Sequence, residues 1–424
     1  MILFMIISFI VLMILGIPVF ISTAIPVIVY FIFEGPDYIM IRVMAGGVNN
    51  YSLLAIPLFI LAAEIMNACG ITEALFNFCE VICDPLKGGL GHANVVASVI
   101  FAGMSGSAVA DASSLGLVEI KAMRMRGYDE SFTIGVTGSS SIIGPIIPPS
   151  IVMIVYAVVN DISVGRLFAG GILPGLLMGL SLMIMIYLLA DKFKCPPPRS
   201  FSAKEIFYAF KKGFWAIFTP VIILGGMFGG LFTPTEASAI ATLYSIFLGI
   251  IVYKKLTLKR FYSAMKDTTL ICAKILVIIA FSCIFGWVLA KEQVPQAAAT
   301  LILSFTKGNY YLTLLLINVL LIIVGMFLDQ TPAIIILSPI LMPIAGNLGI
   351  NPYHFGVMVV LNLMIGALTP PFGQVLFALA GITDYSVEYI VKSVFIWIFP
   401  LIIVLIMVTL FPQITLIIPS LIYK

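Results

Sequence analysis

Two proline-rich segments interrupt otherwise apolar stretches of the chain, and they are the first candidates for chemistry. GPIIPPS occupies residues 144–150 and GALTPPF occupies residues 366–372. A proline pair removes two backbone donors and clashes with the preceding turn, so a regular helix cannot run through it. The carbonyls left unpaired in this way are oxygen ligands suited to a hard cation such as Na⁺. We therefore expect an ion site at the two breaks, with a plain proline kink as the structural alternative.

Two further segments place polar side chains between apolar flanks. One contains Ser105-Gly106-Ser107, and the other contains Asp329-Gln330-Thr331-Pro332. An acid within an apolar segment is costly in a membrane and marks a functional site by default. Asp329 could ligate Na⁺ or shape a substrate pocket. The structural alternatives are a helix cap for Asp329 and hydrogen bonds to their own helix for the Ser and Thr hydroxyls.

The composition requires a membrane around these segments. Of the 424 residues, 62% are hydrophobic and 10% are charged, whereas about 25% are charged in an ordinary soluble domain. This excludes a soluble enzyme and a disordered chain, and the partner that it implies is the lipid bilayer. A spanning helix takes about 20 residues, so the chain could hold on the order of a dozen spans. The net charge of +3 is too small to suggest nucleic acid.

Basic residues give the expected topology. They cluster at residues 121–126, 192–212 and 254–266, and basic loops stay on the cytoplasmic side of a membrane. Pairs of crossings between the clusters keep all three on that side. These crossings are expected at residues 131–159, 167–190, 214–232 and 236–253. The loop 346–354 has no Lys or Arg and is expected outside, as is the C-terminus.

The polar segments recur at one offset, which indicates an internal repeat. Pairs of matching positions lie 222 residues apart, namely Ser107 and Asp329, Gly127 and Gly349, Gly144 and Gly366, and Pro148 and Pro370. Because loop 119–130 is expected inside and loop 346–354 outside, the two repeats are inverted in the membrane. Inverted repeats with interrupted helices are typical of secondary transporters.

The spacing of the elements predicts how each repeat is built. Segments 90–118 and 312–345 are too short for two crossings, which need about 40 residues, so we expect re-entrant helical hairpins. Segments 131–159 and 355–381 are then the interrupted helices. The predicted fold is an all-α polytopic membrane protein with inverted repeats. In the first hairpin we expect Asp111 to cap a helix and Glu119 to face the cytoplasm.

At this point the chain resembles a known family nearly end to end. The segments that carry the resemblance are IPLFILAAEIM (56–66), SGSAVADASSLG (105–116), RGYD to GPIIPPSI (126–151), GLFTPTEASAIA (230–241), FLDQTPAIIILSPILMPIA (327–345), HFGVMVVLNLMIGALTPPFG (354–373) and FPQITLIIPSLI (411–422). Together they resemble the large membrane subunit of tripartite ATP-independent periplasmic (TRAP) transporters.

The resemblance implies a function and a set of partners. It implies Na⁺-coupled import of an organic acid, of the C4-dicarboxylate or sialic acid class, with two or more Na⁺ ions. A soluble periplasmic binding protein would deliver the acid, and a small four-helix membrane subunit would be a separate chain. The protein would lie in the bacterial inner membrane with a periplasmic C-terminus. Transport would be of the elevator type, in which one domain moves past a fixed scaffold.

The same resemblance divides the chain. It implies scaffold helices in 1–85, the first repeat of the transport domain in 86–165, scaffold and connecting helices in 166–311, the second repeat in 312–385 and a C-terminal helix in 386–424. The first Na⁺ site would use Ser105, Ser107 and the carbonyls near Gly144, Ile147 and Pro148. The second would use Asp329, Thr331 and the carbonyls near Gly366 and Thr369. The substrate would lie near Ser107, Ser150 and Asp329.

The chain departs from the family pattern at one place, and other functions are also considered. Residues 108–111 read AVAD, where relatives often have another hydroxyl, which could alter substrate preference. A primary pump is disfavoured because no G-x-x-x-x-G-K-[ST] motif occurs, and an intramembrane enzyme because H-E-x-x-H and G-x-S-x-G are missing. The alternative that stays open is a stand-alone Na⁺/carboxylate symporter that needs no binding protein.

Overall fold

The computed structural model describes residues 1–35, 39–200 and 202–423, and all regular structure in these residues is helical. The helices in chain order are α1 (Ile2–Ile14), α2 (Val19–Glu34), α3 (Ile39–Val48), η1 (Tyr51–Leu54), α4 (Ala55–Ala68), α5 (Ile71–Cys83), α6 (Gly89–Ser105), α7 (Ala108–Ala110), η2 (Asp111–Leu115), α8 (Gly116–Met125), α9 (Glu130–Ser141), α10 (Ile151–Val159), α11 (Val164–Leu189), α12 (Ala203–Phe228), α13 (Pro234–Phe247), η3 (Leu248–Val252), α14 (Leu258–Lys291), α15 (Val294–Thr306), α16 (Tyr310–Phe327), α17 (Gln330–Asn347), α18 (Pro352–Ala367), α19 (Gln374–Ile382), α20 (Val387–Leu410) and α21 (Gln413–Ile422). Eight helices within the described ranges are long and apolar enough to cross a membrane, so the chain is a multi-span membrane protein.

The two proline segments end helices where the sequence predicts. The helix α9 stops at Ser141 and α10 starts at Ile151, while α18 stops at Ala367 and α19 starts at Gln374. Each break contains one cis peptide bond, Pro148–Pro149 in the first and Pro370–Pro371 in the second. The two helices on either side of each break together make one interrupted element.

The two polar tips also fall between helices. Gly106 lies between α6 and α7 with φ of 60°, a left-handed conformation that glycine adopts without a steric penalty. Asp329 lies between α16 and α17 and is the N-cap of α17. The second arm of the first hairpin differs from the prediction, because α7, η2 and α8 continue to Met125, beyond the expected end at residue 118.

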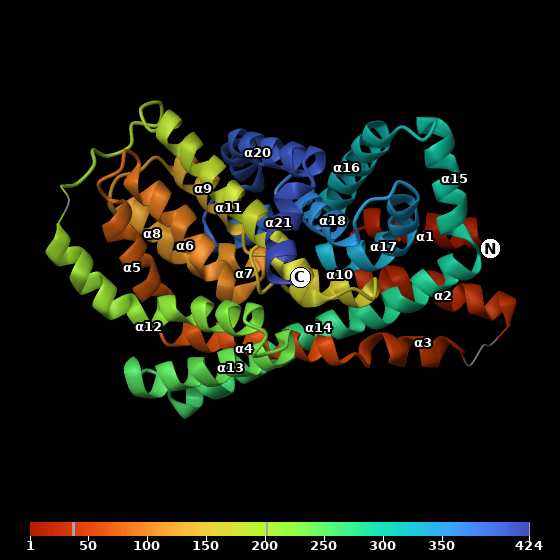
Figure 1. The fold of residues 1–424 in the computed structure, drawn as a ribbon, viewed down its shortest axis with the longest axis horizontal. Coiled ribbons are helices and arrows are strands. Elements are labelled where there is room, and N and C mark those ends of the chain that lie inside the picture. Colours follow the sequence, from red (N-terminus) through yellow and green to blue (C-terminus); the bar gives the residue numbers. More distant parts are fainter. Residues whose placement is uncertain (36–38, 201, 424) are drawn as a thin grey trace.

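Long helices pack against the interrupted helices, of which α10 and α18 lie near the middle of the view in Figure 1. The helix α9 packs against α20, α18 packs against α16, and α11 packs against both α20 and α21. A second layer crosses the lower part of the view, where α4 pairs with α13, and α14 packs along α2, α3 and α4. The long helix α14 also contacts α17, so it connects the outer layer to the second hairpin.

The C-terminal segment corrects one prediction. The sequence analysis expects a single helix within 386–424, but α20 ends at Leu410 and α21 begins at Gln413. Pro412 lies in the gap and cannot donate the backbone hydrogen bond that a continuous helix needs. After this break α21 packs along α11, which brings the end of the chain back to the centre in Figure 1.

The tight crossing of α9 and α20 yields a testable prediction. A Cβ added at Gly135 would overlap the Trp397 ring and would lie 2.6 Å from the carbonyl oxygen of Ser393. We expect Gly135→Ala to destabilise the protein by about 1–3 kcal/mol, the usual cost of overpacking. Gly225→Ala is the matched control, since a Cβ there meets nothing within 4 Å. Thermal unfolding in detergent checks both variants, and equal midpoints would contradict the packing.

Candidate functional site

The first hairpin tip rests directly on the first helix break. A Cβ added at Gly106 would lie 2.5 Å from the carbonyl oxygen of Pro149 and 3.2 Å from the Cα of Ser150. Only a glycine allows this approach with the positive φ that the turn requires. The structure thus brings the predicted residues Ser105 and Ser107 next to the proline segment.

Asp111 belongs to this cluster, and the sequence analysis missed that role. The hydroxyl of Ser105 donates a short hydrogen bond to Oδ1 of Asp111. The other carboxylate oxygen, Oδ2, lies against the Cα of Gly144 and has no hydrogen-bond partner among the described residues. Asp111 is only 2% exposed. A buried carboxylate oxygen without a partner is costly, and a bound cation would satisfy it.

The expectation that Asp111 caps a helix is wrong, because another residue does so. The hydroxyl of Ser107 accepts the backbone N–H of Ala110 at 3.4 Å and caps α7. Asp111 instead opens a π-helical turn, η2, and such turns occur frequently at functional sites. The signal available in the sequence was an acid a few residues beyond a polar tip. The side of the helix on which it lies depends on the π turn, which the sequence pattern did not predict.

Backbone oxygens complete the first cluster. Among the described residues, the carbonyl oxygens of Gly144, Ile147 and Pro148 accept no hydrogen bond. The Ile147 side chain packs on Gly175 of α11, where an added Cβ would overlap it, which anchors the break against that helix. Hydroxyl, carboxylate and carbonyl oxygens form a donor set that fits a hard cation such as Na⁺.

The second cluster is built the same way but with different polar groups. Gly325, near the end of α16, packs on Gly366, since a Cβ added at Gly366 would lie 2.6 Å from the Cα of Gly325. Oδ1 of Asp329 accepts the backbone N–H of Gln330 at 2.6 Å. The Gln374 side chain lies close to this carboxylate. Asp329 thus places the second tip beside the first residue of α19, just after the second break.

Two of the remaining predicted residues of the second site, Gly366 and Thr369, form local hydrogen bonds. The carbonyl of Gly366 accepts the backbone N–H of Thr369 at 2.9 Å. The Thr369 hydroxyl donates to the carbonyl of Ile365 at 2.7 Å. Thr331 is buried in the first turn of α17, two residues from Asp329. The carbonyl oxygen of Thr369 accepts no hydrogen bond among the described residues, so the second break also keeps a free carbonyl, and the charge of the second cluster comes from Asp329.

The three predicted substrate residues share one feature: each caps a helix N-terminus. Ser107 caps α7, Ser150 accepts the N–H of Met153 at 3.1 Å and caps α10, and Asp329 caps α17. The structural alternative for Asp329, a helix cap, is therefore what is observed. Helix N-termini present unpaired N–H groups and a positive dipole end, which favour anions.

Two of these helices start side by side. The side chain of Asn160, just after α10, donates to the Ser338 hydroxyl of α17 at 2.8 Å. Val155 and Ile335 line one cavity, and Val159 and Pro339 line it further along the same two helices. This register means that α10 and α17 run in the same direction with their N-termini at the same level. Ser150 and Asp329 therefore stand near each other at one end of the pair.

Glu119 is not where the sequence analysis expects it. It is 1% exposed, and its Oε1 has no hydrogen-bond partner in the described structure. The helix α8 packs against α9 and α5, which covers the face that carries Glu119. The prediction that Glu119 faces the cytoplasm is wrong, because the basic loop begins only after this buried turn.

The chain matches a known protein family over most of its length. Residues 6–414 match the family described as "Tripartite ATP-independent periplasmic transporter, DctM component". The chain belongs to this family. It is therefore a transporter permease and not an enzyme, and the resemblance found in the sequence is confirmed.

Curated relatives agree with this TRAP permease family, and a solved structure shares its fold. The sialic acid TRAP transporter large permease SiaM of Vibrio cholerae is 44% identical over 378 residues, covering 89% of this chain and 88% of the relative. The C4-dicarboxylate TRAP large permease DctM of Pseudomonas aeruginosa is 37% identical over 372 residues, covering 88% and 87%. The crystal structure of the Alcanivorax borkumensis YdaH transporter has a TM-score of 0.63 at 13% identity, covering 90% of this chain and 88% of that chain. That last likeness concerns the fold alone.

The buried oxygen of Asp111 gives a prediction for this permease that needs no partner protein. A ligand that binds only the folded state raises its stability, by about 2.7 kcal/mol at 100 times its Kd. We expect the thermal midpoint of the purified chain to be higher in Na⁺ than in K⁺. Asp111→Asn should remove most of that difference, because it removes the charge beside Gly144. The midpoint shift between the two salts is the measurement.

Asp161→Asn is the matched control for this test. Asp161 has φ of 51°, which Asn tolerates, and it lies in the exposed turn after α10. Its variant should keep the full Na⁺ effect. An Asp111→Asn protein with an undiminished Na⁺ effect would remove Asp111 from the cation site.

Proposed function

We propose that this chain is the large permease of a Na⁺-coupled TRAP transporter that imports an organic acid. The observation that carries the proposal is the pairing of each hairpin tip with a helix break. At the first pair, an oxygen of Asp111 and three carbonyls of the break have no hydrogen-bond partner among the described residues, and at the second Asp329 caps α17. Such paired oxygen clusters in interrupted helices suit Na⁺ and substrate sites of secondary transporters.

The charges of the clusters explain why the acid would need Na⁺. Asp111 and Asp329 would repel a carboxylate substrate in an apolar setting, where charge interactions are strong. With Na⁺ held by these residues, the negative charge is cancelled and the N-termini of α7, α10 and α17 can receive the substrate carboxylate. The coupling is reciprocal, so substrate should tighten Na⁺ by the factor by which Na⁺ tightens substrate.

An asymmetry between the hairpins supports elevator-type movement. The second arm of the second hairpin, α17, packs against α14 and α15. The corresponding arm of the first hairpin has a face that no other described helix covers, where Val109 is 38% and Leu117 is 52% exposed. In the topology predicted from the basic loops, the packed side is periplasmic and the open side is cytoplasmic. We infer an inward-open arrangement, from which the repeats would move against α14 to face the other side.

Family membership and relatives' names support the substrate class and the partners. The family is tripartite and periplasmic by description, which fits a soluble binding protein and a small membrane subunit supplied as separate chains. Named relatives carry sialic acid or C4-dicarboxylates. We propose one of these acid classes as the substrate and the bacterial inner membrane as the location, with a periplasmic C-terminus. A stand-alone symporter is the competing function.

Reconstitution separates the two functions. The chain and its small membrane subunit are placed in proteoliposomes with an inward Na⁺ gradient. Labelled sialic acid or C4-dicarboxylate is then supplied with and without the loaded binding protein. Uptake that needs both the gradient and the binding protein is the expected result. Uptake without the binding protein would favour the stand-alone symporter, and uptake that ignores the gradient would contradict Na⁺ coupling.

Substitutions at the tips predict a change in apparent Na⁺ affinity in this assay. We expect Asp329→Asn to raise the Na⁺ concentration for half-maximal uptake by about tenfold, since an interaction with a charged group is worth about 1.5–3 kcal/mol. Ser107→Ala should raise it by roughly threefold to tenfold. Ser113→Ala is the control, because its hydroxyl donates only to carbonyls of its own helix. Unchanged Na⁺ dependence in both tip variants would contradict the site.

A further inference from the structure

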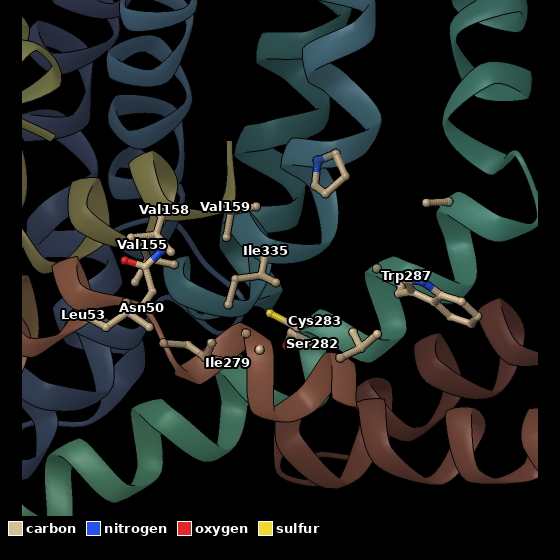
Figure 2. A pocket seen from close by; sticks show the side chains of 16 residues that line it. Asn50, Leu53, Val155, Val158, Val159, Ile279, Ser282, Cys283, Trp287 and Ile335 are labelled. Atoms are coloured by element: carbon tan, nitrogen blue, oxygen red, sulfur yellow. The ribbon is translucent and has the colours of Figure 1, made fainter. Parts of the chain in front are cut away.

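A cavity of about 380 Å³ separates the second hairpin from the outer helices, away from both ion clusters (Figure 2). We call it the interface cavity. It lies between α3, η1 and α14 on one side and α10 and α17 on the other. Volumes of about 300–1,000 Å³ are typical of small-molecule sites. In Figure 2, Asn50 and Leu53 lie at one end of the cavity and Trp287 at the other, with Cys283 between them.

The lining defines the chemistry of an occupant. Its walls are mostly aliphatic, and no charged side chain in the described parts of the chain lines it. Ser282 is among the lining residues, and its buried hydroxyl has no hydrogen-bond partner in the described structure. The carbonyl oxygen of the Asn50 side chain accepts the N–H of Ser52 at 2.9 Å, which leaves the amide N–H₂ as a donor. The occupant is therefore apolar and uncharged, with a hydrogen-bond acceptor.

The transported acid does not fit this description. Transfer of a carboxylate into an unpaired apolar setting is very costly, and the interface cavity offers no cation. By contrast, an apolar molecule dissolved in the bilayer can enter the cavity at little cost in free energy. The unpartnered Ser282 hydroxyl would also gain the hydrogen bond that it lacks.

A molecule bound in the interface cavity would affect any movement between the helices that line it. Val155 and Val159 of α10 form one wall, Ile335 and Pro339 of α17 extend it, and Ile279 of α14 faces them. Under the proposed function, α10 and α17 move relative to α14. The cavity walls would then separate, and a ligand that binds only the assembled cavity stabilises that one state.

We propose that the interface cavity binds an uncharged apolar molecule with one hydrogen-bond acceptor, drawn from the bilayer, and that its occupancy arrests transport. The inference that a molecule binds here depends only on the cavity and the residues that line it. The arrest rests on the proposed function, so binding and uptake are measured separately.

Cys283 provides a probe for the site. Its thiol lines the cavity beside Gly47, where an added Cβ would lie 2.5 Å from the sulfur. N-phenylmaleimide has the required chemistry: it is uncharged, with an apolar ring and two carbonyl acceptors. In the reaction the sulfur bonds to one alkene carbon and the thiol proton ends on the neighbouring carbon, with no leaving group. A charged thiol reagent of similar size should be excluded.

The test uses the reconstituted transporter with Cys283 as its sole cysteine, the other five being replaced by Ala. We expect N-phenylmaleimide to modify the folded protein once, as read by intact mass, and to lower Na⁺-driven uptake at least fivefold. In a Cys283→Ala protein with Cys272 retained on the same helix, the reagent should leave uptake at its untreated value. Uptake before treatment reports on the proposed function independently.

Three results would overturn the proposal. Modification of Cys283 only after denaturation would show that the cavity does not admit such a molecule. Modification without a loss of uptake would show that occupancy does not arrest transport. Equal reactivity with the charged reagent would contradict the uncharged class of ligand.

A filling variant tests the cavity without a reagent. Ile279→Trp should occupy the interface cavity, lower uptake at least threefold and slow maleimide modification of Cys283 at least tenfold. Val277→Trp is the control on the same helix, since Val277 is 40% exposed and does not line the cavity. Both variants are checked for a single folded species by size-exclusion chromatography. Equal modification rates in the two variants would contradict the assignment.

Discussion

A helix that stops inside a membrane must provide partners for its freed backbone groups, and this constraint organises the structure. Water is not available there, so the partners come from protein or from a bound ion. At the first break the element packed over these groups is a hairpin tip, with Gly106 pressed against Pro149 and Ser150. At the second it is the end of α16, with Gly325 against Gly366. Each break is thus covered by a hairpin, and the proposed ion sites lie where the two meet.

The two repeats solve this constraint with the same framework and different polar groups. Ser140 of α9 donates to the side chain of Asn94 at 2.6 Å, and Asn362 of α18 donates to the side chain of Asn318 at 2.7 Å. Ser140 and Asn362 lie 222 residues apart, so in both repeats an equivalent position ties the first hairpin arm to the interrupted helix. The acids do not follow this symmetry, because Asp329 caps its tip while Asp111 lies beyond its own.

This difference shows what the sequence could and could not predict. Proline pairs, polar tips and their common offset act through local backbone geometry, so the helix breaks were predictable to within a few residues. The placement of Asp111 and Glu119 depends on the π turn η2 and on which helix covers α8, and neither leaves a pattern in the residues around them. The split between α20 and α21 at Pro412 was signalled by proline, but the apolar run around it favoured one span.

The distribution of polar groups affects how the repeats could move against α14. Inside the repeats, Asn, Ser and Asp side chains lock hairpins to interrupted helices, and breaking those contacts would leave polar groups unpaired at a cost of about 1–3 kcal/mol each. The surface between α14 and the helices α10 and α17 is different, because its cavity has aliphatic walls with glycines at Gly47 and Gly286. Apolar contacts are non-directional, so this surface can be exchanged for another apolar one without losing hydrogen bonds. In the proposed elevator movement, the hydrogen-bonded repeats would form the rigid unit and this apolar surface would be the one that slides.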